Sequence, residues 1–202
     1  MTARPAGTRL CLYDTAQLEP VLAGMAARIA ALFATRDSPV AMIGILRRGL
    51  PLAERLRQQL AGLGLPPWPL YPLRLQRYAD DLSLLHAQTA LTGNPDIAAL
   101  DLANTRLLLV DDVLYEGHSL LRACAWLAQL GASEIRTAVL VDRVVTRQPV
   151  HADVAGLHLQ VAPGDVIECN VPPYEARLCI ELLRPQRRDA TGGTRQMPVP
   201  PV

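Results

Sequence analysis

Lysine is absent from this sequence of 202 residues, so all 20 of its basic residues are arginine. The absence excludes Schiff-base enzymes, pyridoxal-phosphate anchors and the phosphate-binding lysine of Walker A loops, because each of these needs a lysine amine. Arginine, by contrast, suits bidentate binding of phosphate groups. We therefore expect any phosphate bound by a basic side chain to be held by arginine.

Metal-binding and disulfide patterns are also missing. No CxxC pair and no HExxH spacing occurs among the cysteines and histidines, which are Cys11, Cys124, Cys169, Cys179, His86, His118, His151 and His158. Isolated cysteines without such spacing are typical of buried free thiols in a reducing compartment. We predict free, buried cysteines and no zinc site.

Long hydrophobic runs and a strong net charge are lacking as well. No stretch approaches the ~18 uninterrupted apolar residues of a membrane span, and the first residues lack the hydrophobic centre of a signal peptide. The net charge of +1 gives no general electrostatic case for nucleic acid or membrane binding. We predict a cytoplasmic protein with one domain over residues 1–186, followed by a disordered, Gly/Pro-rich tail over 187–202.

What the chain does contain is a series of apolar runs of strand length. The expected strands are 40–46, 105–110 and 135–141, an edge strand within the Pro-rich piece 65–75, and shorter strands at 158–161 and 166–171. Expected helices alternate with them: 16–35 after a cap at Asp14 or Thr15, a helix with Pro51 in its first turn that ends at Gly62 and Gly64, and 120–130 capped by Ser119. Alternating strands and helices predict an α/β protein with a parallel sheet.

Charged or flexible residues follow three of these strands: Arg47-Arg48-Gly49, then Asp111-Asp112 with residues 115–119, then Asp142-Arg143. Each alone has an ordinary explanation, such as solvated arginines or a surface ion pair. In an open parallel sheet, however, the carboxyl ends of the strands line one ligand crevice. Together the three ends fit a phosphorylated ribose that carries pyrophosphate. The helix N-terminus would bind the monophosphate, the two carboxylates would accept hydrogen bonds from the sugar hydroxyls, and the arginine turn would bind the second anion.

The segment LLLVDDVLYEGHSL (107–120) resembles the phosphoribosyl-diphosphate (PRPP) motif of type I phosphoribosyltransferases. Together with IGILRRGLPLAERL (43–56), RYADDLS (77–83) and AVLVDRVVTRQPVHADVAG (138–156), it makes the chain similar to the PyrR family of pyrimidine-operon regulators and uracil phosphoribosyltransferases. The resemblance covers residues 14–183. It implies a three-layer α/β fold with a mostly parallel sheet and helices on both faces.

The resemblance also implies roles for individual residues. Asp111, Asp112 and Arg48 would be catalytic. PRPP would contact Arg47, Arg48, Gly49, Asp111, Asp112, Val113, Leu114, Tyr115, Glu116, Gly117, His118 and Ser119, with the ribose hydroxyls on the two aspartates and the 5′-phosphate on residues 115–119. A mobile loop would carry Arg77, Tyr78, Asp80 and Asp81, and the base would lie near Val141, Asp142 and Arg143.

The reaction implied is displacement of pyrophosphate from PRPP by uracil to give UMP. The family uses Mg²⁺ held mainly through PRPP rather than directly by the protein. Its members suggest a homodimer or a higher homo-oligomer, with RNA as a further partner of the regulators.

The chain departs from the family pattern at four positions. Glu116 stands where threonine is usual, His118 and Ala79 replace arginines, and Leu157 replaces a lysine. A carboxylate ~4 Å from a phosphate charge costs roughly 1 kcal/mol in water and about 4 kcal/mol at an effective dielectric near 20. Alternatively, Glu116 points to solvent and complements the helix N-terminus, which is worth less than about 1 kcal/mol.

These departures leave two main hypotheses, an active uracil phosphoribosyltransferase and a catalytically degenerate PyrR-like protein that binds a nucleotide or RNA. A third hypothesis, a phosphotransfer domain with Asp111 or Asp112 as nucleophile, is disfavoured because such domains ordinarily need a lysine.

Overall fold

A five-stranded parallel sheet forms the centre of the computed structural model, which describes residues 7–34, 38–75 and 94–185. Its strands lie in the order β3 (Leu70–Leu73), β2 (Val40–Ile45), β4 (Arg106–Leu114), β5 (Glu134–Asp142) and β6 (Val154–His158). The parallel α/β class predicted from the apolar runs is confirmed, and the Pro-containing strand β3 lies at an edge as expected.

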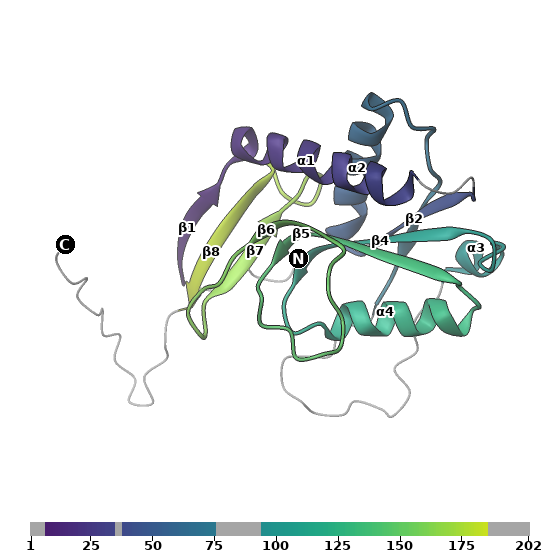
Figure 1. Ribbon diagram of the computed structural model, residues 1–202. Helices are drawn as coiled ribbons and strands as arrows, with labels where there is room; N and C mark the ends of the chain where they lie inside the picture. Colours follow the sequence, from purple (N-terminus) through teal and green to yellow (C-terminus); the bar gives the residue numbers. More distant parts are fainter. Residues whose placement is uncertain (1–6, 35–37, 76–93, 186–202) are drawn as a thin grey trace.

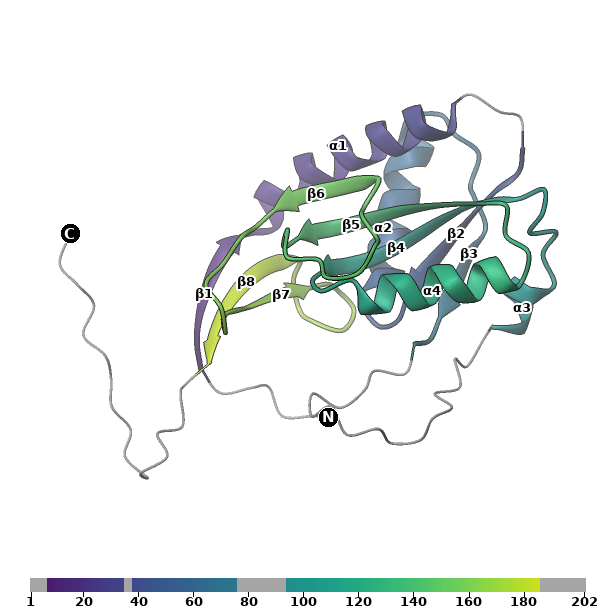
Figure 2. The same cartoon turned by 60° about the horizontal axis from the view of Figure 1, so that its bottom comes forward.

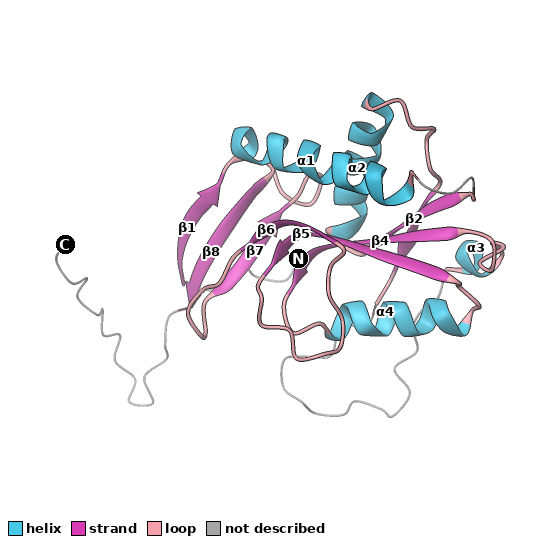
Figure 3. Cartoon of the chain, viewed as in Figure 1, coloured by secondary structure: helices cyan, strands magenta, loops and turns pink. Residues whose placement is uncertain are grey.

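Helices cover both faces of this sheet (Figures 1 and 3). Helices α1 (Thr15–Phe33) and α2 (Gly49–Gly62) lie on one face, while α3 (Pro95–Ala98) and α4 (His118–Gln129) lie on the other. Successive residues of β4 alternate between the two cores, with Leu108 and Val110 in one and Leu107 and Leu109 in the other. The strand is therefore apolar on both faces, and the three-layer architecture is confirmed.

Helix α1 begins at the expected cap. The side chain of Asp14 accepts a hydrogen bond from the Gln17 backbone, and the Gln17 side chain accepts one from Asp14 N–H, which together form a capping box. By length and mean hydropathy (19 residues, 1.2) α1 is the one helix among the described residues that could cross a membrane. Core helices share this composition, and α1 buries one face, from Leu18 to Phe33, against the sheet.

A second, antiparallel sheet lies beyond the carboxyl ends of the parallel strands, and Figure 2 shows the arrows of β4, β5 and β6 pointing toward it. It has the order β1 (Gly7–Tyr13), β8 (Cys179–Pro185), β7 (Val166–Asn170). The segment 166–171 was expected as a strand, but β1 and β8 were not. They pair the first described residues with the last, a contact that no local pattern encodes.

Three local predictions were wrong. Strand β4 does not end at Val110 but continues to Leu114, so the two aspartates lie within the strand, and Asp111 is in register with Val139. Ser119 does not cap α4, because the helix begins at His118 after Gly117. Strand β6 ends at His158, where the expected strand 158–161 was to begin.

All four cysteines are free, as predicted, although their burial differs. Cys169 on β7 and Cys179 on β8 are buried, Cys124 is partly buried, and Cys11 is exposed. The expectation of burial was wrong for Cys11, which is exposed together with its neighbour Leu10 on the edge strand β1, where the pairing register shifts between Cys11 and Tyr13.

Candidate active site

The arginine turn after β2 packs directly onto β4. A Cβ atom added to Gly49 would lie 2.5 Å from the carbonyl oxygen of Val110 and 3.1 Å from the Cα of Asp111. Real Cβ atoms do not approach backbone so closely, so only glycine permits this contact. The turn formed by Arg47, Arg48 and Gly49 is thereby held beside the two aspartates, as the sequence predicted.

Asp111 and Asp112, hereafter the acidic pair, are largely buried near the carboxyl end of β4. Asp111 is 8% exposed and Asp112 is 6% exposed, and the Asp112 N–H donates to Asp111 Oδ1 at 2.9 Å. Buried carboxylates are costly unless they are paired or hydrogen-bonded. The positive charge of Arg48 acts on Asp112 and supplies part of that compensation.

Arg48 is itself held by the turn that follows β7. Its Nε and Nη2 donate to Glu175 Oε1 at 3.1 and 2.6 Å. Although burial alone would lower the pKa of Arg48, the hydrogen bond from its guanidinium to Glu175 and the charge of Asp112 raise it above its ordinary value. Arg48 therefore remains a cation in a partly buried place.

The same turn covers the second arginine. The Tyr174 ring lies 4.9 Å from the guanidinium carbon of Arg47, within cation–π range, and the Val171 N–H fixes Glu175 by donating to its Oε2 at 2.9 Å. Sequence reasoning missed Tyr174 and Glu175. Arg48 and Glu175 are 127 residues apart, and only the docking of the small sheet brings them together.

Residues 115–119, hereafter the phosphate loop after the role predicted for them, comprise the connection from β4 and the first two residues of α4. Gly117 has a φ of 90°, a backbone conformation that favours glycine, and it is the residue that precedes the helix. No side chain of the described residues caps the helix, so the N–H groups of its first turn have no side-chain acceptor. Helix starts of this kind can bind anions, and the place of the 5′-phosphate stays a prediction.

Glu116 does not point freely to solvent, which was one of the two alternatives considered for it. Its side chain is 27% exposed, with Oε1 lying 3.5 Å from Arg147 Nη1 and Oε2 lying 3.4 Å from His118 Nε2. The carboxylate thus neither extends freely into solvent nor stands without a neighbouring cation. Arg147, to which the sequence analysis assigned no role, belongs to the surroundings of the phosphate loop.

A cavity of about 190 Å³ lies between the end of β4, from Val113 onward, and the small sheet. Arg143 lines it and is 6% exposed; its Nη1 donates to the Asp165 carbonyl at 3.1 Å, while the buried Nε has no hydrogen-bond partner among the described residues. The guanidinium also lies over the ring of Tyr115 at 4.7 Å. The remaining lining residues are Val113, Gly164, Asp165, Val166 and Ile167.

The other two residues predicted near the base are placed differently. Val141 is fully buried in the core, and the Asp142 carboxylate accepts a hydrogen bond from Val144 N–H at 2.8 Å, which shapes the turn after β5. The part of the small sheet around Asp165 was missed as a cavity wall. The segment was expected as a strand, but its position over β4 depends on long-range packing.

Cys169 lies under the acidic pair, with its Sγ 3.8 Å from the Asp112 carbonyl oxygen. Burial, assisted by the charge of Asp112, raises the pKa of this thiol well above its ordinary value. A thiol in this state is a poor nucleophile, so Cys169 contributes packing between β7 and β4.

The predicted mobile-loop residues Arg77, Tyr78, Asp80 and Asp81 lie outside the described residues, as does Ala79. Leu157, the fourth departure from the family pattern, pairs with Val141 on the edge strand β6. Within the described ranges, no group of three or more His, Cys, Asp or Glu side chains could hold a metal ion.

Comparison with known proteins gives a consistent assignment. Residues 12–176 match the phosphoribosyl transferase domain family. The chain is 37% identical to the bifunctional protein PyrR of Deinococcus radiodurans over 148 residues, covering 73% of this chain and 80% of the relative. It is 29% identical to the PyrR of Actinobacillus pleuropneumoniae over 174 residues, covering 86% and 96%. Among solved structures, the hypoxanthine phosphoribosyltransferase of Trypanosoma cruzi superposes with a TM-score of 0.70 at 17% identity, covering 89% and 96%.

Proposed function

This chain belongs to the phosphoribosyl transferase domain family and, within it, to the PyrR proteins, and from this premise we propose that it transfers the phosphoribosyl group of PRPP to uracil, yielding UMP and pyrophosphate. Mg²⁺ bound to PRPP and a cytoplasmic, homo-oligomeric protein are parts of the same proposal. The base and the residue roles rest on the site described above.

The observation that carries the choice of base is the small cavity lined by Arg143 and Tyr115. A guanidinium at the wall of such a cavity offers N–H donors to the carbonyl oxygens of a ligand. The cavity, at about 190 Å³, lies below the roughly 300–1,000 Å³ of pockets for drug-sized ligands. A single pyrimidine ring with carbonyl oxygens at its rim fits both its size and its donor.

In the proposed reaction, the bond from ribose C1 to the pyrophosphate oxygen breaks with its electron pair on pyrophosphate. The C1–N1 bond to uracil forms, and the N1 proton is released. No side-chain nucleophile is needed, so the protein acts by alignment and by electrostatic stabilisation. Asp111 and Asp112 accept hydrogen bonds from the ribose hydroxyls, and the phosphate loop binds the 5′-phosphate.

Arg47 and Arg48 stabilise the negative charge that develops on the leaving pyrophosphate. Mg²⁺, when bound through PRPP, supplies further positive charge to the same oxygens. Because Arg48 is also bonded to Glu175, pyrophosphate must share or replace that carboxylate. The small sheet, which carries Glu175 and one wall of the cavity, excludes water from the reacting atoms.

A second candidate is a PyrR-like regulator that binds a nucleotide or RNA without turnover. Two contacts favour it: Glu116 brings a negative charge into the phosphate loop, and Glu175 engages the arginine expected to bind pyrophosphate. RNA binding has weaker support, since the net charge is only +1 and the exposed arginines are scattered.

The two candidates are separated by incubating the protein with PRPP, Mg²⁺ and uracil and measuring UMP and pyrophosphate. Hypoxanthine in place of uracil is the control for the base. The proposal expects turnover with uracil and far less with hypoxanthine. PRPP-dependent thermal stabilisation without turnover would favour the regulator, and absence of both would remove PRPP as the ligand.

A further inference from the structure

The connection between β5 and β6, residues 143–153, packs against the phosphate loop through its backbone. The Glu116 carbonyl accepts hydrogen bonds from the N–H groups of Arg147 at 3.0 Å and Gln148 at 3.3 Å. A Cβ atom added to Gly117 would lie 2.8 Å from methyl groups of both Thr146 and Val150. The two segments are therefore fixed to each other without any help from charged side chains.

A charged contact is added to this backbone docking. The Glu116 carboxylate lies 3.5 Å from the Arg147 guanidinium and 3.4 Å from the His118 imidazole, which is a cation only when protonated. The guanidinium of Arg147 supplies the positive charge of this contact. Its side chain is 76% exposed, so it makes little packing contact and acts chiefly through its charge.

The contact is significant because of where Glu116 stands. The residue belongs to the loop proposed to receive a phosphate dianion, and a carboxylate within a few ångströms of that dianion repels it. Arg147 draws the carboxylate toward the β5–β6 connection and offsets its charge. The helix N-terminus can then present its N–H groups to a phosphate without an opposing negative charge.

We propose that Arg147 is a positioning residue for PRPP: it holds the Glu116 carboxylate against the β5–β6 connection and neutralises it, so that the phosphate loop can accept the 5′-phosphate. The inference rests on the proposed function, because it concerns the affinity of the same loop. It assigns no contact between Arg147 and the substrate.

The test compares four variants with the wild-type protein: Arg147→Gln, Glu116→Gln, the double variant, and Arg57→Gln as a matched control. Arg57 also forms an ion pair, with Glu54 on α2, away from the phosphate loop. Arg147→Gln keeps the backbone hydrogen bonds to Glu116. Dissociation constants for PRPP with Mg²⁺ and for ribose 5-phosphate are measured by calorimetry, and KM and kcat by UMP formation.

For Arg147→Gln we expect about a tenfold rise in KM for PRPP and a similar rise in the dissociation constant of ribose 5-phosphate, with kcat little changed. The rise shrinks at high salt, because both groups are partly exposed to solvent. Adding Glu116→Gln to Arg147→Gln restores both constants to within about threefold of wild type. Arg57→Gln leaves them unchanged.

Unchanged affinity in Arg147→Gln, or a loss that Glu116→Gln does not restore, would overturn the inference while leaving the proposed function intact. A loss without restoration would assign Arg147 a purely structural role. If the wild-type protein binds neither PRPP nor ribose 5-phosphate, the proposed function and the inference fall together.

Discussion

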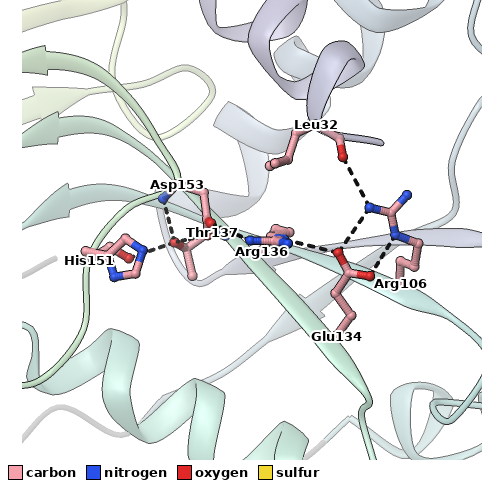
Figure 4. Close-up of polar contacts among 7 residues, drawn as sticks. All are labelled: Leu32, Arg106, Glu134, Arg136, Thr137, His151 and Asp153. Carbon is pink, nitrogen blue, oxygen red and sulfur yellow. Dashed lines mark hydrogen bonds and ion pairs between the residues drawn. The ribbon is translucent and has the colours of Figure 1, made fainter. Parts of the chain in front are cut away.

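At the amino edge of the parallel sheet, where β4 and β5 begin, arginines and carboxylates form ion pairs and hydrogen bonds with one another (Figure 4). Arg106 donates to both Glu134 oxygens at 3.0 Å and to the carbonyls of Leu32 and Phe33 at the end of α1. At the carboxyl edge, the same residue types stand beside a cavity, and the buried Arg143 keeps an Nε without a partner among the described residues. Charges pair within the protein at both edges, but only the carboxyl edge carries the residues of the proposed ligand site.

The network at the amino edge extends along β5 to the start of β6. Arg136 bonds Glu134 and Asp153 at 3.1 Å each, and Asp153 also accepts from the backbone and hydroxyl of Thr137. The His151 carbonyl, at 2.8 Å, is a second acceptor within reach of the single Thr137 hydroxyl proton. Because these groups meet one another's hydrogen-bonding and charge requirements, we expect substitutions there to change the stability of the protein and to leave the reaction intact. The opposite is expected at the carboxyl edge.

The largest effect is expected for Arg106→Ala at the amino edge. Arg106 is 5% exposed, and its guanidinium carbon lies 4.5 Å from the Phe33 ring centre in addition to its hydrogen bonds. Breaking one partner of a buried ion pair costs about 3–5 kcal/mol, so urea unfolding should show a loss of that order. The kcat of the folded fraction should not change.

Arg136→Ala provides the control for Arg106→Ala, because it removes a second guanidinium from the same Glu134 with its side chain 40% exposed. A more exposed pair contributes about 0–1 kcal/mol. Equal losses in the two variants would contradict the importance given to burial, and a lower kcat in Arg106→Ala would break the separation of the two edges.

The next largest effect is expected at the carboxyl edge, for Asp111→Asn combined with Asp112→Asn. Loss of both ribose acceptors should lower kcat/KM for PRPP at least about a hundredfold, equivalent to about 2.7 kcal/mol. The free energy of unfolding should change much less than in Arg106→Ala. Initial rates of UMP formation and urea unfolding measure the two quantities on the same samples.

Asp101→Asn is the control for the acidic pair, since it removes an exposed carboxylate that accepts a hydrogen bond from Asn104, away from the proposed site. Its rates should match wild type. If the paired substitution left kcat/KM within tenfold of wild type, the assignment of the ribose to Asp111 and Asp112 would have to be abandoned.

The difference between the edges also explains what the sequence could predict. The apolar run 40–46 and the cap at Asp14 depend on neighbouring residues, and both were found correctly. The pairing of Arg106 with Glu134 spans 28 residues and that of Arg48 with Glu175 spans 127, so neither has a local signal.

The carboxyl edge was partly predictable because the resemblance identified its loops, yet their partners were not. Glu116 was recognised as unusual from its position alone. Its contact with Arg147 requires the β5–β6 connection to fold over the loop, and that geometry depends on tertiary packing. Asp111 and Asp112 were placed after the strand because acidic residues are rare in strand interiors; the two aspartates instead continue β4 beyond its apolar run.

A smaller effect is expected for the pH dependence of stability at the amino edge. The hydrogen bond from Arg106, opposed by burial and assisted by Arg136, lowers the pKa of Glu134 from 4.5 to about 2. Since the folded pKa lies below the unfolded one, the stabilisation is present above about pH 5 and is lost as the pH falls through 2.

One pKa unit corresponds to about 1.4 kcal/mol, and solvent at the edge of the sheet reduces the expected contribution of Glu134 to about 1–2 kcal/mol. In urea unfolding between pH 5 and pH 2, Glu134→Gln should therefore lose less stability than wild type by that amount. Parallel curves for the two proteins would show that the ion pair does not contribute to acid sensitivity.

The smallest effect concerns Val144, the one non-glycine residue with a positive φ among the described residues. Its φ of 54° costs a β-branched side chain roughly 1–2 kcal/mol, and the turn is held by the hydrogen bond to Asp142. Glycine normally destabilises a folded chain relative to alanine, but here Val144→Gly should be more stable than Val144→Ala by about 1 kcal/mol. Because the turn also fixes the adjacent Arg143, Val144→Gly should raise the KM for uracil several-fold. If Val144→Ala proved more stable than Val144→Gly, the backbone at Val144 would not be strained. The two edges of the sheet would then differ only in how their charged groups are paired.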